Sequence, residues 1–442
     1  METPVYDFLT KYARSGFLRA HMPGHKGISP VQELQGAFDL DITEITGADS
    51  LFEASGIIKQ SEENASKLFG TAETVYSCGG STLCIQAMLY LMKQEKRTVV
   101  AMRTVHRAFL NACVLLGLDV VWVYPSEDKG ILSGEYSPEA FEKALCSLGG
   151  EPACVYVTSP DYTGHMADIA GISEVCRKFG APLLVDNAHG AHLAFTEERL
   201  HPMQLGAELC CDSAHKMLPC LTGCAYLHTS SEKYKSRLKA AMSMFGSTSP
   251  SYLMLCSLDL CNDFLEKNGA DNIRKIRAEA CRMKDALSGR YIFTDSEPLH
   301  IAVDTAAMGW DGRKLAQQLE AMGCYPEYAG RELVVLLLSA AEPLESIILL
   351  EAALGGCEDC IDTEPVKKAP SFPQLQAVMS IRDAALCESE VIPVSEAEGR
   401  ICAGVHVPCP PAVPIVISGE VITEGAAQVL SFYGIDEIRV VL

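Results

Sequence analysis

The chain has 442 residues and a mass of 47.8 kDa, roughly three times the usual length of one domain, so two or more packed units are expected. Hydrophobic residues make up 48% of the sequence and charged residues 21%, which excludes a disordered chain and a small disulfide scaffold. The 36 lysines and arginines against 57 acidic residues give a net charge of −21, which argues against a nucleic-acid surface or an anionic membrane face.

The 19 cysteines do not form a regular disulfide pattern, because their number is odd and many stand inside apolar segments. The first residues lack the cationic and then apolar pattern of a secretion signal. No stretch reaches the ~20 uninterrupted apolar residues of a membrane helix. These patterns predict a protein of the reduced cytoplasm that binds neither nucleic acid nor membrane.

Residues 1–60 are broken by prolines and glycines and predict an arm with little periodic structure of its own. From residue 61 onward, short apolar runs alternate with helical stretches, which predicts an α/β fold with a mostly parallel sheet covered on both faces. The expected strands are 74–77, 98–102, 119–124, 154–157 and 182–185, and the expected helices include 61–69 and 81–92.

The character of the chain changes after about residue 250. A charged helix is expected over 272–288, then strands 300–303 and 332–338 around a helix 311–322, a linker over 362–373, a helix 374–386, a turn at Pro408–Pro411 and a strand 438–442. The predicted divisions are an arm over 1–60, a large domain over 61–250, linking helices with a small α/β domain over 251–365, and a C-terminal domain over 366–442.

The strongest chemical signal is Ser213-Ala214-His215-Lys216, which follows the strand ending at Asp186. Ligands of open α/β sheets bind at the carboxyl ends of the strands, where Asp186 stands. A lysine amine forms an imine with an aldehyde, and a buried carboxylate can hold a pyridine nitrogen protonated. The alternative is a surface lysine and a capping aspartate, which α/β proteins commonly have.

Gly79-Gly80-Ser81-Thr82 follows one predicted strand and opens a helix, so its backbone N–H groups and hydroxyls can face an anion. It is neither a Walker loop nor a GxGxxG fingerprint, and an ordinary turn or helix cap is the alternative. A phosphate cradle, a strand-end carboxylate and a later lysine, in that order, are the parts that a pyridoxal phosphate (PLP) enzyme needs.

Two histidine pairs and one cysteine pair raise the question of a metal site. His21 and His25 are separated by Pro23 and Gly24, which disfavour the helical zinc geometry. His189 and His192 lack a nearby general-base glutamate. Cys357 and Cys360 have no second pair, so we expect no metal.

Together these segments resemble the Orn/Lys/Arg decarboxylase family, which are basic amino-acid decarboxylases of the aspartate-aminotransferase (fold type I) PLP class. The resemblance is dense over the first 250 residues and thinner over the last 50. The matching segments are 21–27, 41–44, 70–82, Arg103-Thr-Val-His106-Arg107, Ser159-Pro160-Asp161-Tyr162-Thr163-Gly164, 186–192, 213–216, Ser247-Thr-Ser-Pro-Ser251-Tyr252, Gly399-Arg400 and 414–420.

The resemblance implies a role for each matching residue. Lys216 would bind the cofactor as an imine, Asp186 would pair with its pyridine nitrogen, His106 would stack on its ring, and His189 would lie beside the ring. Lys216 or His189 would return a proton to the substrate. The cofactor-binding residues implied by the resemblance are Gly80, Ser81, Thr82, His106, Asp186, His189, Ser213, His215 and Lys216, with Thr248 from a partner subunit.

The function implied is the decarboxylation of arginine, lysine or ornithine by a homodimer, or a larger homo-oligomer, with shared active sites. Glu44 and Asp49 are candidates for binding the distal cation of the substrate. Other fold type I reactions, such as transamination or retro-aldol cleavage, and a homologue without turnover are the alternatives. The intact Lys216 argues against the last.

The sequence departs from the family pattern in ways that bear on substrate choice and rate, although none of them removes the lysine or the aspartate. The chain resembles the compact form of the family, without an N-terminal wing. The departures are Asn187 for the usual Glu, Ala214 for Thr, Asp161-Tyr162-Thr163 for Thr-Tyr-Tyr, and Gly80 where Asn or Gln is common.

Overall fold

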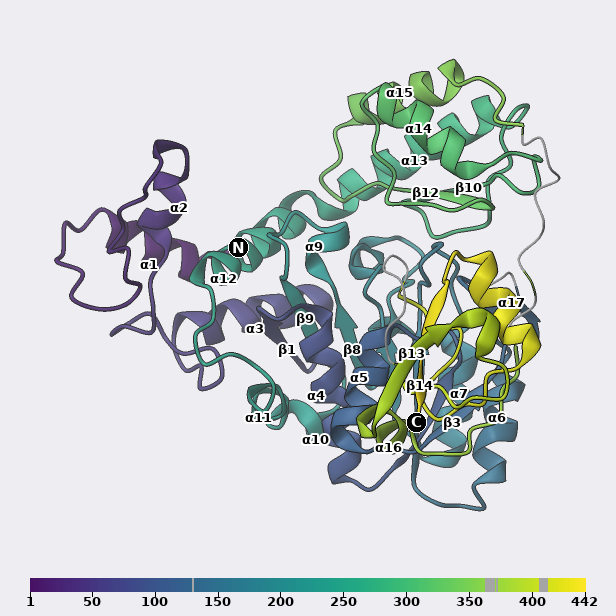
Figure 1. Cartoon of the computed structure of the whole chain (residues 1–442). Helices are drawn as coiled ribbons and strands as arrows, with labels where there is room; N and C mark the ends of the chain where they lie inside the picture. Colours follow the sequence, from purple (N-terminus) through teal and green to yellow (C-terminus); the bar gives the residue numbers. More distant parts are fainter. Residues whose placement is uncertain (129–130, 362–369, 371–372, 405–411) are drawn as a thin grey trace. The chain divides into compact units, whose positions relative to one another are not determined.

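The computed structural model describes residues 1–128, 131–361, 370, 373–404 and 412–442 (Figure 1). These residues form two compact units, which are described separately. Unit 1 is Met1–Leu91, Leu184–Ile273 and Ser339–Ala341, and unit 2 is Met92–Leu183, Arg274–Leu338 and Glu342–Leu442. Most of the expected linker over 362–373 and the whole turn at 408–411 lie outside the described residues.

Unit 1 contains four adjacent strands of the central sheet, in the order β1-β9-β8-β7. β7 and β8 run parallel, with Asp186 opposite Cys211, so both strands end at the same edge of the sheet. β9 runs antiparallel to both of its neighbours. The strands are β1 (Glu73–Ser77), β7 (Leu183–Asp186), β8 (Leu209–Asp212) and β9 (Ala225–Thr229), and every residue in them is buried.

Helices of unit 1 build a core of aliphatic and aromatic side chains around Tyr76, Tyr226 and Leu255. Two of these helices follow strands directly and are the ones that bear on the site: α4 after β1, and α9 after β8. The helices are α1 (Pro4–Ala13), η1 (Gln32–Leu34), α2 (Gln35–Leu40), α3 (Ile57–Phe69), α4 (Gly80–Gln94), η2 (Ala191–Phe195), α8 (Pro202–Leu205), α9 (Ala214–Met217), α10 (Glu232–Lys235), α11 (Leu238–Ser243), α12 (Tyr252–Phe264) and η3 (Leu265–Gly269). α4 ends in unit 2, and α13 (Ala270–Leu287) begins in unit 1 and belongs to unit 2 from Arg274 onward.

The arm over residues 1–60 is more ordered than the sequence predicts, because α1 is a ten-residue helix with Val5 and Leu9 buried. Its first turn is capped from a distant part of the chain. The Asp259 carboxylate, on α12, accepts hydrogen bonds from the backbone N–H groups of Val5 and Tyr6, both at 3.0 Å. A cap supplied from so far along the chain leaves no local signal in the sequence.

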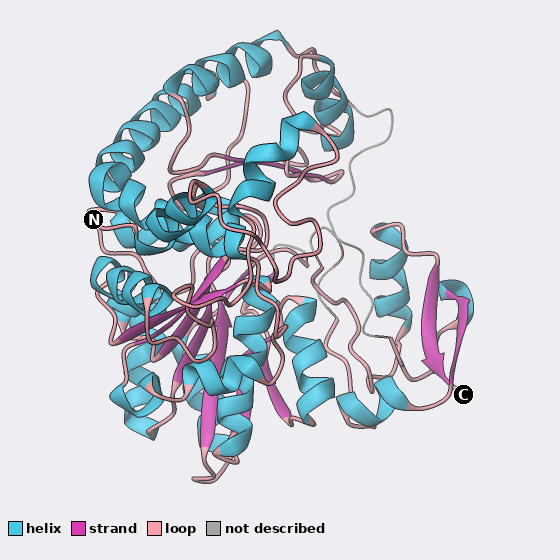
Figure 2. Ribbon diagram, turned by 90° about the vertical axis from the view of Figure 1, so that its left-hand side faces the viewer, coloured by secondary structure: helices cyan, strands magenta, loops and turns pink. Residues whose placement is uncertain are grey.

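Unit 2 contains the other three strands, in the order β6-β2-β3, and all of them run parallel. Helices alternate with these strands, and Figure 2 shows helices lying along the strands. The expected α/β class with a mostly parallel sheet is therefore confirmed. The elements are β2 (Thr98–Met102), α5 (Arg107–Leu116), β3 (Val120–Val123), β4 (Glu127–Asp128), β5 (Gly134–Glu135), α6 (Pro138–Ser147), β6 (Ala153–Thr158) and α7 (Ile169–Phe179).

A smaller antiparallel sheet, in the order β10-β12-β11, follows in unit 2 and shares a core with the C-terminal segment. Ala302 and Val335 of this sheet pack with Val394, Val429 and other C-terminal residues. The elements are β10 (His300–Asp304), α14 (Gly312–Ala321), β11 (Tyr328–Ala329), β12 (Leu333–Leu337), α15 (Leu344–Gly356), α16 (Ile381–Leu386), β13 (Ser389–Pro393), η4 (Val394–Glu396), α17 (Glu424–Phe432) and β14 (Glu437–Val441).

The helix expected over 374–386 is wrong in its first half, since α16 begins only at Ile381. The preceding residues pair with an extended segment instead. The N–H of Val421 bonds to the carbonyl of Gln376, and the N–H of Val378 bonds to the carbonyl of Gly419. These pairings satisfy backbone groups that a helix would have satisfied internally.

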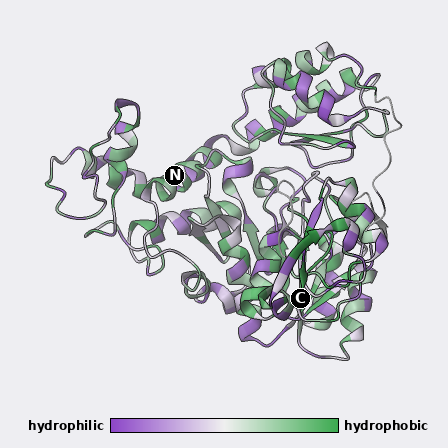
Figure 3. Ribbon diagram, in the orientation of Figure 1, coloured by the Kyte–Doolittle hydropathy of each residue, from purple (hydrophilic) through white to green (hydrophobic). Residues whose placement is uncertain are grey.

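Hydropathy follows this architecture: the strands of the sheets are mainly hydrophobic, whereas the polar residues lie mostly on helices and loops (Figure 3). Among the described residues, no helix combines the length and the apolar character needed to cross a membrane.

Candidate active site

The candidate site lies where β7 and β8 of unit 1 end. Because the two strands are parallel neighbours, the turns that follow them leave the sheet at the same edge. The turn after β7 carries His189, and the short helix after β8 carries Lys216. The Lys216 amine lies 2.9 Å from Nε2 of His189. The structure therefore brings together two of the predicted catalytic residues, although 27 positions separate them in the sequence.

Asp186 is the last residue of β7 and its side chain is buried. Its Oδ1 accepts a hydrogen bond from the backbone N–H of Ala188 at 3.2 Å and from the thiol of Cys211 at 3.7 Å. These bonds hold the carboxylate at the strand end. A buried carboxylate of this kind favours the protonated form of a nitrogen base placed beside it.

The predicted phosphate loop leads into α4. Gly80 has a φ of +65°, and a Cβ there would meet no atom within 4 Å, so backbone conformation rather than space requires glycine. Next to it, the Ser213 hydroxyl donates a hydrogen bond to the Ser81 hydroxyl at 2.8 Å, which joins the phosphate loop to the lysine motif.

His215 belongs to the same motif, and its Nδ1 lies 3.0 Å from the Cys224 carbonyl, to which it can only donate. Thr82 lines a cavity of about 280 Å³ in unit 1 together with Gly79. Ser247, Ser249 and Ser251 of the predicted partner loop line the same cavity of the same chain. Thr248 is not among the lining residues, and its reach into a partner subunit stays a prediction.

His106 belongs to unit 2, so its stacking role also stays a prediction. Its Nδ1 accepts a hydrogen bond from the N–H of Ala108 at 3.2 Å, which caps α5. The segment before it is held by Arg103, which is fully buried. The Arg103 guanidinium donates to the carbonyls of Pro414 and Ile415, at 2.9 and 3.1 Å, and pairs with Glu420 at 3.1 Å.

The departure at Asp161 forms a self-contained turn in unit 2. Its Oδ1 accepts hydrogen bonds from the backbone N–H and the hydroxyl of Thr163, at 2.9 and 2.8 Å, and from the N–H of His165 at 3.1 Å. Burial raises the pKa of Asp161. Asp161 and Thr163, which both depart from the family pattern, therefore form hydrogen bonds with each other within this turn.

The two acidic candidates for the distal cation of the substrate differ in their surroundings. Asp49 accepts backbone N–H bonds from Gly56, Ile58 and Lys59 at the start of α3. Burial acts to raise the pKa of Asp49, but its backbone hydrogen bonds lower it overall, as suits a helix cap. Glu44 is exposed, and its Oε1 accepts a hydrogen bond from the Ser50 hydroxyl at 2.7 Å.

The histidines considered for metal binding have other partners. His21 Nε2 lies 2.6 Å from the Tyr12 hydroxyl, and His25 Nε2 lies 3.1 Å from Asp41. Cys357 donates to the carbonyl of Ala353 at 3.3 Å. Among the described residues, one group that the sequence reasoning missed brings three potential metal ligands within 4.8 Å of one another: His201, Cys210 and Asp212. The sequence signal for this group is Asp212, a charged residue at the end of the otherwise apolar strand β8.

The residues of unit 1 fit PLP. Lys216 offers an amine for its aldehyde, Asp186 a buried carboxylate for its pyridine nitrogen, and the start of α4 with Ser81 and Ser213 offers donors for its phosphate. When bound, PLP supplies an electron sink for bond cleavage at the α-carbon of an amino acid. His189 is placed to exchange a proton with the Lys216 amine.

Comparisons with known proteins identify the family of the chain. The family model described as Orn/Lys/Arg decarboxylase, major domain, matches residues 3–306, and that of the C-terminal domain matches residues 366–437. An arginine decarboxylase of Halalkalibacterium halodurans is 31% identical, covering 96% of this chain and 91% of the relative. An arginine decarboxylase of Bacillus subtilis is 29% identical, covering 96% of this chain and 92% of the relative.

The crystal structure of the Francisella novicida lysine decarboxylase LdcF has the same fold, with a TM-score of 0.82 over 99% of this chain and 79% of that one, at 17% identity. Family membership brings with it decarboxylation of a basic amino acid and a PLP cofactor. The chain belongs to the Orn/Lys/Arg decarboxylase family.

Proposed function

We propose that this enzyme decarboxylates arginine, with PLP held by Lys216. The observation that carries the proposal is the 2.9 Å contact between the Lys216 amine and His189, at the ends of the parallel strands β7 and β8. Asp186 would keep the pyridine nitrogen of the cofactor protonated. His189 would hold or remove a proton at the Lys216 amine.

The preference for arginine is supported by the relatives named above. Two arginine decarboxylases align along 96% of the chain, so the likeness extends beyond the cofactor motifs. The lysine decarboxylase structure, at 17% identity, supports the fold alone. An acidic chain with a net charge of −21 is also compatible with a cationic substrate.

Incubation of the purified protein and PLP with arginine, lysine or ornithine tests the proposal. We expect CO₂ and the corresponding amine in equal amounts, with the highest kcat/KM for arginine. A Lys216→Ala variant is the control for non-enzymatic release. A keto acid product would instead indicate transamination, and a higher kcat/KM for lysine or ornithine would change the substrate.

We also propose that the enzyme is a cytoplasmic homodimer, or a larger homo-oligomer, that supplies an amine for polyamine synthesis. Its described cysteines are free thiols, which suits a reducing compartment. Light scattering on the protein as it elutes from a size-exclusion column measures the number of subunits. A stable, active monomer would contradict the proposed homo-oligomer.

A further inference from the structure

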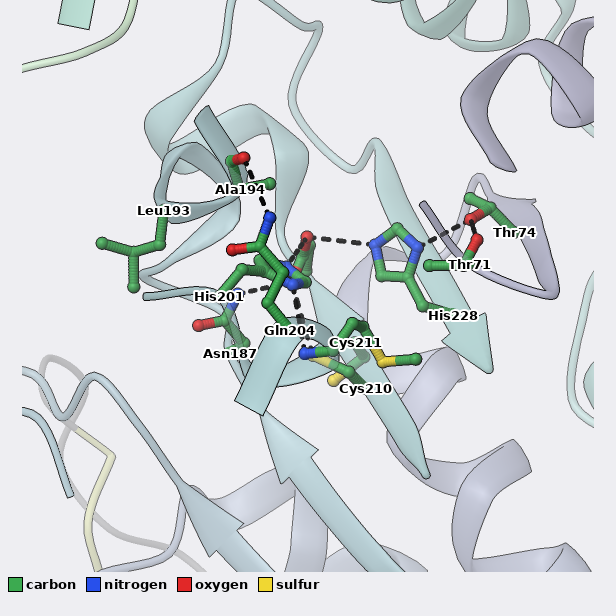
Figure 4. Close-up of polar contacts among 12 residues, drawn as sticks. Thr71, Thr74, Asn187, Leu193, Ala194, His201, Gln204, Cys210, Cys211 and His228 are labelled. Carbon is green, nitrogen blue, oxygen red and sulfur yellow. Dashed lines mark hydrogen bonds and ion pairs between the residues drawn. The ribbon is translucent and has the colours of Figure 1, made fainter. Parts of the chain in front are cut away.

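A buried charged cluster lies under the two turns that carry His189 and Lys216. Its centre is Asp212, the last residue of β8, whose side chain is fully buried. The carboxylate lies 2.7 Å from Nδ2 of Asn187 and 3.0 Å from Nε2 of both His201 and His228. Figure 4 shows the side chains of Asn187, His201 and His228 meeting at this point.

The outer partners of the imidazoles define which nitrogens carry protons. The backbone N–H of Met203 donates to His201 Nδ1 at 3.3 Å, so the proton of a neutral His201 lies on Nε2 and points to Asp212. His228 Nδ1 pairs with the Thr74 hydroxyl at 2.8 Å, and burial lowers the pKa of His228. Each imidazole therefore directs its Nε2–H group at the Asp212 carboxylate.

Asp212 is the charged member of this cluster. Burial alone would raise the pKa of Asp212, but the two imidazoles and their N–H bonds hold it well below its usual range. An ionised carboxylate that accepts three N–H bonds in a buried site is a strong acceptor, because such bonds are charge-assisted and no water competes.

Asn187 connects the cluster to the active-site turn. It directly follows Asp186 and stands two residues before His189. Its backbone N–H continues the sheet by bonding to the Cys211 carbonyl at 2.9 Å, and its side chain adds the bond to Asp212. Asn187 Oδ1 has no hydrogen-bond partner among the described residues, so Asp212 is what orients this amide.

The other strand continues directly from Asp212 into the lysine motif. Ser213 follows it, and the backbone N–H of Lys216 bonds to the Ser213 carbonyl at 3.1 Å. The two turns are thus tied at their base by the Asn187–Asp212 bond and meet at their tips through the His189–Lys216 contact.

We propose that Asp212 is a positioning residue, which acts through Asn187 to fix the turn after Asp186 and so to hold His189 against Lys216. The consequence for catalysis rests on the proposed function. The proposal also accounts for the departure at position 187, because the glutamate usual in the family would set a second buried carboxylate against Asp212.

A metal ion is the competing interpretation, since His201, Cys210 and Asp212 could hold one. Hydrogen bonds account for the geometry without it, because both histidines already direct N–H groups at the carboxylate. The Cys210 thiol also donates to Oδ1 of Asp212, at 3.7 Å.

A double-mutant cycle of Asn187→Ala and Asp212→Asn tests the link, with Thr74→Val as the matched control. Thr74 belongs to the same cluster but contacts His228, on the side away from the turns. The measurements are the melting temperature of the apo-protein, the rate at which the apo-protein binds PLP at Lys216, and kcat and KM for the preferred amino acid.

Each single change at 187 or 212 should slow both PLP capture and kcat by about tenfold, with a smaller effect on KM. The double variant should be no slower than the worse single variant, because both changes break one link. Thr74→Val should lower the melting temperature and leave kcat within about twofold.

If the losses in kcat from the two single changes multiply to about a hundredfold in the double variant, Asp212 does not act through Asn187. A kcat within twofold of wild type for Asp212→Asn would also overturn the proposal. If the protein retains stoichiometric zinc after dialysis, the cluster is a metal site rather than a set of hydrogen bonds. If the wild-type protein binds PLP but releases no amine from any of the amino acids, the proposed function is refuted. The role of the Asn187–Asp212 bond is then still tested by the rates of PLP binding, which do not require turnover.

Discussion

At the residue scale, we expect Lys216 to be the group that binds the aldehyde of the cofactor. Lys216→Ala should abolish the visible absorption band of the holoenzyme, the band that borohydride bleaches in the parent protein, because only an amine at this position can condense with the aldehyde. Absorbance spectra before and after borohydride measure it. An unchanged band in the variant would place the reactive lysine elsewhere.

Asp186 makes a different contribution at the same scale. Asp186→Asn should retain PLP, which is held largely through its phosphate, and should lower kcat by several orders of magnitude, because a neutral amide cannot stabilise a protonated pyridine nitrogen. Steady-state amine release measures kcat, and the absorption band reports retention. A loss smaller than about tenfold, or ~1.4 kcal/mol of barrier, would contradict the role.

At the element scale, the docking of α1 depends on the buried Asp259 of α12. Burial raises the pKa of Asp259 from 3.8 to about 6. Because the folded form binds its proton more tightly than the unfolded form, the stability that this group contributes is fully present below pH 3.8 and is lost as pH rises through about 6.

We therefore expect faster hydrogen exchange in α1 at pH 7.5 than at pH 5, after correction for intrinsic rates. Asp259→Asn should remove most of this difference. Exchange in β2, which belongs to unit 2, serves as the internal control. A pH dependence in α1 that persists in the variant would assign the effect to another group.

The C-terminal segment is joined to the His106 segment by the buried pair of Arg103 and Glu420. Glu420→Gln leaves the Arg103 charge buried and only partly compensated, so we expect a loss of about 3–5 kcal/mol in the free energy of unfolding. Replacing both residues, as in Arg103→Met with Glu420→Leu, should cost less. Urea denaturation measures both, and a double variant less stable than the single one would exclude this account.

The helices and strands also show which parts of the fold the sequence predicts. The strands at 98–102 and 183–186 were predictable within a residue or so, because central parallel strands are buried on both faces and read as apolar runs. The helix α1 was missed because its cap comes from Asp259, and the cluster around Asp212 was missed because its members converge only in three dimensions. The resemblance predicts Lys216 and His189 as site residues, whereas it does not predict the direct contact between them.

At the scale of the whole molecule, the remaining question is whether each active site takes residues from two subunits. Ser247, Ser249 and Ser251 line a cavity with Gly79 and Thr82 of the same chain, so this loop already lies beside the predicted phosphate loop of its own chain. Thr248 is not among these lining residues, and its contribution to the site of a partner subunit stays a prediction from the family resemblance.

Mixing two inactive variants decides this question. Lys216→Ala and Thr248→Ala proteins are combined under conditions of subunit exchange, which is followed with two affinity tags. If sites are shared, a heterodimer has one site with both residues intact, so statistical mixing should restore about a quarter of the wild-type activity. If Thr248 serves its own chain, both sites of the heterodimer lack a residue and activity stays at the level of the parents. Thr248→Ser is the matched control, because it keeps the hydroxyl and should remain active alone.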